Sequence, residues 1–152
     1  MTEEKVTVKL ENFLEEYFKL IELEVTFNVV EEVEVVKVNL KTDGDVAGLL
    51  IGAKGKNIYS FQRLLNIIFN REEGQKNIVV NVDDWREKEE DRLEELARKT
   101  ADHVKETGQP QNLYNLSASQ RRIIHTFLAE FEGIKTESQG EGDERFLVVS
   151  AS

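Results

Sequence analysis

The chain has 152 residues, 39% hydrophobic and 33% charged, a composition typical of a folded globular protein that excludes a disordered one. It contains no cysteine, which excludes disulfides and thiolate metal sites and favours a reducing compartment. The net charge of −10 disfavours tight, non-specific binding to nucleic acids, although residues 41–80 carry 6 basic and 4 acidic side chains and are the one basic segment.

The first half of the chain is predicted to contain three helices and three strands. Residues 5–21 place apolar side chains at helical spacing, whereas residues 23–29 and 36–40 alternate apolar and polar side chains as strands do. Two helices joined by a glycine-bearing loop follow, and Gly74 is expected to end the second of them. Residues 78–82 form the last strand, so the predicted order is α-β-β-α-α-β.

The most informative segment is the loop Gly52-Ala53-Lys54-Gly55 between the two helices. Glycine adopts backbone angles closed to other residues and lets another backbone approach closely. Backbone amides and lysines in such a loop can hold a phosphodiester backbone. The alternative is a tight turn with no ligand, while a nucleotide-binding P-loop is excluded because Leu50 and Asn57 stand where it requires glycine and serine or threonine. The candidate RNA-binding residues are Gly52, Ala53, Lys54, Gly55, Lys56, Asn57 and Arg63.

This loop resembles the G-x-x-G loop of a KH domain, which clamps about four nucleotides of single-stranded nucleic acid. The order α-β-β-α-α-β is that of a type II KH domain, and the predicted KH domain covers residues 1–83.

The second half begins with a long charged helix. Asp84 is expected to cap it, with Glu87 three residues later, and Trp85 is interpreted as a core residue at the domain junction. Gly108 and Pro110 end this helix.

Three further elements complete the second predicted domain, residues 84–152. Residues 111–116 are expected to form a short strand, and Ser117 caps the last helix with Gln120 in a capping box. The polar, glycine-bearing stretch 136–142 precedes a closing strand at residues 146–149. The expected order here is α-β-α-β, and the fold class of the whole chain is α+β.

A second group of basic residues lies on this last helix. Arg121 and His125 stand at positions i and i+4, so they share one helical face. An arginine fork beside an imidazole suits a phosphate oxygen and a stacked base, although a solvated face with no ligand is the alternative. The candidate residues of this second nucleic-acid face are Arg121, Arg122, His125 and Arg145.

The Arg-x-x-x-His spacing resembles the single-stranded nucleic-acid-binding domain named after it. Its position after a KH domain makes the chain similar, from about residue 5 to 152, to the bacterial Jag family, also called KhpB or SpoIIIJ-associated. Two departures are visible: many members carry an additional N-terminal domain, and Ala53 stands where a basic residue is common.

The resemblance implies a non-catalytic, cytoplasmic protein that binds single-stranded RNA, or DNA, and regulates genes after transcription. It also implies links with cell-envelope growth, division or membrane-protein insertion, and a small KH-domain protein as partner. The acidic segments favour an alternative, a protein-protein adaptor. We expect no catalytic residue, metal, cofactor or membrane insertion, because no nucleophile–base pair, ligand cluster or long apolar run is present.

Overall fold

The computed structural model of the protein describes residues 5–70 and 75–152, and the chain divides into two compact units. Unit 1 ends at Arg86 and unit 2 begins at Glu87. The division therefore falls three residues beyond the boundary predicted at Asp83, because Trp85 and Arg86 pack against unit 1.

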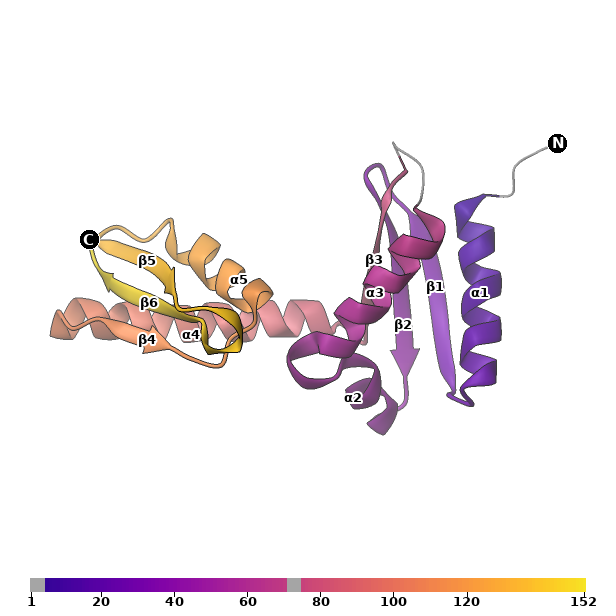
Figure 1. The fold of residues 1–152 in the computed structure, drawn as a ribbon, viewed down its shortest axis with the longest axis horizontal. Helices are drawn as coiled ribbons and strands as arrows, with labels where there is room; N and C mark the ends of the chain where they lie inside the picture. The colour runs from indigo at the N-terminus through magenta and orange to yellow at the C-terminus, as the bar shows by residue number, and fades with distance from the viewer. Residues whose placement is uncertain (1–4, 71–74) are drawn as a thin grey trace. The chain divides into compact units, whose positions relative to one another are not determined.

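Unit 1 has the predicted order α-β-β-α-α-β (Figure 1). Its elements are α1 (Val6–Leu20), β1 (Val25–Glu31), β2 (Val35–Thr42), α2 (Asp45–Ile51), the 3₁₀ turn η1 (Ala53–Gly55), α3 (Lys56–Phe69) and β3 (Asn77–Val82). The helix α3 ends at Phe69, and Gly74, predicted to end it, lies outside the described residues.

The sheet of unit 1 has the order β1-β2-β3, with β1 antiparallel and β3 parallel to the central strand β2. Alternate residues of β2 and β3, such as Val38 and Val80, are completely buried under the helices. The intervening residues Lys37 and Lys41 of β2 are exposed on the opposite face. One face of this sheet therefore forms the core, and the helices α2 and α3 hold the glycine loop above it.

Unit 2 continues the helix that starts in unit 1 and adds a second sheet (Figure 1). Its elements are α4 (Trp85–Thr107), β4 (Gln111–Leu113), α5 (Ala118–Leu128), β5 (Ile134–Gln139), the 3₁₀ turn η2 (Gly142–Glu144) and β6 (Phe146–Ala151). The sheet is antiparallel with the order β4-β6-β5. Both helices pack on one face, where Leu93, Ala97, Ile124 and Leu147 are completely or almost completely buried.

Two details of unit 2 differ from the sequence prediction. The expected order α-β-α-β omits β5, whose polar sequence resembles a loop because it is an edge strand with Ile134 as its one buried residue. The predicted strand at 111–116 stops at Leu113, and Asn115 has a left-handed backbone with φ +57°. The α+β class is confirmed, with one strand more than predicted.

The two predicted helix starts have different outcomes. The capping box at Ser117 is confirmed, because its side chain accepts the Gln120 amide and the Gln120 side chain accepts the Ser117 amide. Asp84 does not have the extended backbone of an N-cap, since its φ is +58°. The Arg86 amide instead donates to Asn81 Oδ1 at 3.2 Å.

Candidate nucleic-acid interface

The glycine loop is a tight turn with an unusual backbone. Gly52 and Gly55 have φ values of +71° and +76°, and Lys54 between them has φ +55°. Positive φ angles are costly for residues with a Cβ. Glycine avoids this cost at two of the three positions, and Lys54 alone bears it. The turn consists of Gly52 and η1, and it joins the end of α2 at Ile51 to the start of α3 at Lys56.

The amides of this loop fall into two groups. The Gly52 amide donates to Gly48 O at 2.9 Å, the Gly55 amide to Gly52 O at 3.2 Å, and the Lys56 amide to Ala53 O. Within the described ranges 5–70 and 75–152, the amides of Ala53 and Lys54 have no hydrogen-bond partner, and both residues are exposed. The loop thus presents the amides of its two middle residues, while the glycine amides hold its shape.

Gly55 has a second reason to lack a side chain. It is buried, and a Cβ there would lie 2.4 Å from Trp85 Cη2 and 3.0 Å from Tyr59 Cε2. Trp85 and Tyr59 pack edge to face with their ring centroids 6.1 Å apart. Trp85, a half-buried residue packed against the core of unit 1, therefore supports the loop at Gly55.

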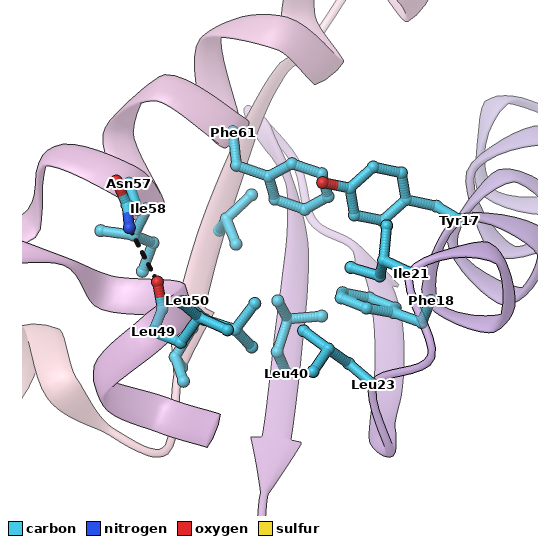
Figure 2. Close-up of a pocket in the computed structure, with 12 residues that line it drawn as sticks. Tyr17, Phe18, Ile21, Leu23, Leu40, Leu49, Leu50, Asn57, Ile58 and Phe61 are labelled. Atoms are coloured by element: carbon cyan, nitrogen blue, oxygen red, sulfur yellow. Dashed lines mark hydrogen bonds between the residues drawn. The ribbon is translucent and has the colours of Figure 1, made fainter. Parts of the chain in front are cut away.

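Asn57 braces the other end of the loop. Its Nδ2 donates to Leu49 O at 2.8 Å, as Figure 2 shows, and a Cβ on Gly52 would lie 2.6 Å from Asn57 Cγ. Asn57, one of the candidate RNA-binding residues, thus uses its Nδ2 to fix the turn, although the residue remains exposed.

Three basic side chains belong to the loop and the helix that follows it. Lys54, Lys56 and Arg63 are all exposed, and among the residues that the structure describes none of them makes an ion pair or hydrogen bond. Lys56 and Arg63 lie seven residues apart on α3 and therefore share one face of it. Lys54 and Lys56 therefore supply unpaired positive charge at the loop itself, and Arg63 adds to it two turns further along α3.

The free edge of β3 carries a feature that the sequence analysis missed. Asn66 accepts the Ile78 amide at 2.9 Å and donates to Ile78 O at 2.8 Å. Gln62 Oε1 accepts the Val80 amide at 3.0 Å, and Arg86 Nε donates to Val80 O at 2.7 Å. These side chains hydrogen-bond the outward-facing backbone N–H and C=O groups of Ile78 and Val80, with which an added strand would have to pair. The edge is therefore protected against strand pairing.

An apolar pocket of about 280 Å³ lies in the same unit (Figure 2). The end of α1, the strands β2 and β3, and the helices α2 and α3 line it, and Tyr17 and Phe61 approach each other across it with ring centroids 5.2 Å apart. Leu49 and Ile21, which contribute to its wall, are 59% and 41% exposed. These exposed apolar side chains make the pocket a candidate for protein binding.

The second group of predicted residues meets in one concavity of unit 2. All four predicted residues line a hollow of about 400 Å³ together with three uncharged neighbours: Arg121, Arg122, His125, Arg145, Ala118, Thr136 and Ser138. The structure thus brings Arg145, which follows η2, to the basic face of α5. Among the described residues that line this basic concavity, none is acidic.

Arg121 is held in place by the backbone. Its Nη1 donates to Leu116 O at 2.7 Å and to Arg145 O at 3.3 Å. His125 does not pair with Arg121; its Nδ1 hydrogen-bonds to Thr136 Oγ1. The guanidinium is therefore oriented before any ligand arrives, and Arg122 and Arg145 remain exposed beside it.

The first turn of α5 is also tied to α4 within unit 2. The buried Gln120 donates from Nε2 to Glu89 Oε1 at 2.7 Å, and Glu89 pairs with Arg92 at 2.8 Å. The Arg92 hydrogen bond lowers the pKa of the Glu89 carboxyl below its ordinary value, and Gln120 acts in the same direction against burial. This network helps to fix the helix that carries the arginines.

The described residues lack the features of two other kinds of site, a metal centre and a membrane span. Residues 5–70 and 75–152 contain no cluster of three or more histidine, cysteine or acidic side chains able to bind a metal ion. None of the helices described is both long enough and apolar enough to span a bilayer.

The fold and the two sites define a class of protein: a KH domain followed by an Arg-x-x-x-His domain. A model of the KhpA/KhpB KH domain matches residues 9–82, and a model of the Arg-x-x-x-His domain matches residues 91–151. The chain belongs to the KhpB family, also called Jag, as its sequence predicted.

Three curated relatives show how far the likeness extends. The chain is 39% identical to "RNA-binding protein KhpB" of Bacillus subtilis (strain 168) over 70% of its own length and 53% of the relative's. The protein of the same name from Clostridium symbiosum is 30% identical over 91% of this chain and 63% of the relative. That of Streptococcus pneumoniae serotype 2 is 32% identical over 74% and 34%. The chain thus spans between about a third and two thirds of these relatives.

Proposed function

We propose that this chain is a non-catalytic protein that binds single-stranded RNA through two sites, the glycine loop and the basic concavity. The observation that carries the proposal concerns two exposed residues, Ala53 and Lys54: within the described part of the chain their amides have no hydrogen-bond partner, and the side chains of Lys54 and Lys56 have no ion-pair partner. A phosphate accepts hydrogen bonds from such amides and attracts such charges. The names of the curated relatives support the same ligand.

The basic concavity supplies a contact of a different kind. Arg121 is already oriented, and Arg122, His125 and Arg145 stand around the same hollow, which suits a phosphate group and its sugar. Two modest contacts on one chain raise the overall affinity through effective concentration when one strand engages both. Single-stranded DNA can satisfy the proposed phosphate contacts equally, because it carries the same phosphate groups.

The physiological part of the proposal rests on the family. We propose a cytoplasmic regulator that acts after transcription, linked with cell-envelope growth, division or membrane-protein insertion. We also propose a small KH-domain protein as its partner, because the description of the matching KH model names KhpA beside KhpB. Because the chain spans only part of the length of its relatives, this role and this partner are proposals for the chain.

The loop is tested by reversing its charge. We expect Lys54→Asp with Lys56→Asp to abolish detectable binding of a short single-stranded RNA, because phosphate would then meet two carboxylates. A matched control, Lys9→Asp with Lys19→Asp, changes the net charge equally at exposed positions of α1. Titrations at low salt would measure both variants, and equal affinities for the two would contradict the proposal.

A second candidate function, a protein-protein adaptor, is favoured by the apolar pocket and its exposed rim at Ile21 and Leu49. Partners that stay bound after ribonuclease digestion, and that are lost with Leu49→Asp, would support it. Partners released by ribonuclease would instead support RNA binding as the primary role.

A further inference from the structure

An exposed aromatic side chain lies at one end of the sheet of unit 2. Tyr114 directly follows β4 and is 58% exposed. Its ring packs against that of Phe146, the first residue of β6, with centroids 4.9 Å apart and planes inclined by 39°. Asn112 Nδ2 donates to the Tyr114 hydroxyl at 3.0 Å, so the ring is supported from below and held at its tip.

These side chains lie on the open face of the sheet. Leu147 and Val149 of β6 are buried among the residues of α4 and α5, and successive side chains of a strand point to opposite faces. Phe146 therefore points away from the two helices. The strand pairing of Leu113 with Leu147 sets Tyr114 beside Phe146 on that same outer face.

This aromatic pair is continuous with the basic concavity through the backbone. Arg145, which lines the concavity, immediately precedes Phe146, and the carbonyl of Arg145 accepts a hydrogen bond from Arg121. Arg145 and Phe146 are adjacent in the chain at the N-terminal end of β6, so the concavity and the aromatic pair meet at this end of the strand. A strand of RNA held by a phosphate in the concavity can pass around this end.

We propose that Tyr114, supported by Phe146, is a base-stacking residue that receives an unpaired nucleobase of an RNA strand held in the basic concavity. The inference rests on the proposed function and adds to it a ligand group, the base, that the arginines do not contact. Aromatic rings on open faces are typical platforms for single-stranded nucleic acids, and stacking on them tolerates any base. Tyr114 has the required exposure and is held by Asn112 and Phe146, and Arg145 of the basic concavity precedes Phe146 in the chain.

The test compares two substitutions in the full chain, on two oligomers of equal charge: a 12-nucleotide oligoadenylate and an abasic 12-mer with the same backbone. Tyr114→Leu removes the ring, and we expect it to weaken binding of the oligoadenylate about tenfold. Tyr114→Phe keeps the ring and should bind within about twofold of the unsubstituted chain. Neither substitution should change binding of the abasic oligomer, which has phosphates but no base.

Three results would overturn the inference while leaving the proposed function intact. Tyr114→Leu could bind oligoadenylate as well as the unsubstituted chain, which would exclude stacking. It could weaken the abasic oligomer equally, which would indicate a backbone contact, or Tyr114→Phe could lose as much as Tyr114→Leu, which would assign the effect to the hydroxyl. Failure of the unsubstituted chain to bind either oligomer would overturn the proposed function as well.

Discussion

The glycine loop and the basic concavity prepare for the same ligand in opposite ways. In the loop the backbone is fixed, by glycine amides and by Trp85 behind Gly55, while Lys54 and Lys56 are exposed and unpaired among the described residues. In the concavity the side chain of Arg121 is fixed, by two backbone carbonyls. One site thus relies on an ordered backbone with exposed, unpaired lysines, and the other on an ordered guanidinium.

The largest expected effect concerns the fixed backbone of the loop. Gly55→Ala adds a Cβ at φ +76°, 2.4 Å from Trp85 Cη2, so we expect about 2–4 kcal/mol of destabilisation from backbone strain and overpacking together. Gly108→Ala at the end of α4 in unit 2 is the control, because its φ is +69° but nothing lies within 4 Å of the added atom, and about 1 kcal/mol is expected. Urea unfolding would measure both; equal losses would show that Trp85 does not constrain the loop.

The next test exchanges the two kinds of cation. Arg121→Lys removes the planar guanidinium, whose Nη1 donates to both Leu116 O and Arg145 O and thereby orients the group, so we expect affinity for single-stranded RNA to fall about five- to twentyfold. Lys54→Arg keeps a mobile charge at an exposed position and should change affinity less than about twofold. Titration of both variants at one salt concentration checks the contrast, and equal responses would remove the distinction between the sites.

A smaller effect is expected from the cap of the helix that carries Arg121. Ser117→Ala removes the acceptor of the Gln120 amide, and we expect unit 2 to lose about 1 kcal/mol of stability. Ser119→Ala changes an exposed serine in the same first turn and should be nearly neutral. Thermal unfolding followed by circular dichroism would compare them, and a neutral Ser117→Ala would show that this cap does not stabilise the helix that carries Arg121.

The smallest effect depends on pH. Because Arg92 lowers the pKa of Glu89, the folded state prefers the ionised carboxylate; its stabilising contribution is present above the ordinary pKa of 4.5 and is lost as the pH falls through the lowered value. We expect Glu89→Gln to cost unit 2 about 0.5–1 kcal/mol at pH 7, and less as the pH falls below 4.5.

The matched control for this pH test is Glu95→Gln, whose partner Lys99 is exposed and 3.4 Å away. Its effect should be smaller than that of Glu89→Gln at neutral pH. Unfolding curves at several pH values would measure the difference. An effect of Glu89→Gln that stays constant from about pH 7 to about pH 3 would show that the carboxylate charge does not stabilise the contact with Gln120.

The sequence by itself determined the order of elements in unit 1, the position of the glycine loop, the capping box at Ser117 and the family. These features depend on residues close together along the chain: apolar periodicity, glycine between two helices, and a serine three residues before a glutamine. It also named four of the seven residues that line the basic concavity, although the roles of these residues, and of those in the loop, remain predictions.

Only the tertiary structure decided which groups are free and which are engaged. Asn66 and Arg86 hydrogen-bond the backbone at the edge of β3. Trp85 packs beside Gly55, and the ring of Tyr114 packs against that of Phe146. The edge strand β5 was missed for the same reason, since its polar residues become a strand only by pairing with β6. Such contacts join residues up to thirty-two positions apart, and no local pattern encodes them, because their energy depends on which surfaces folding brings together.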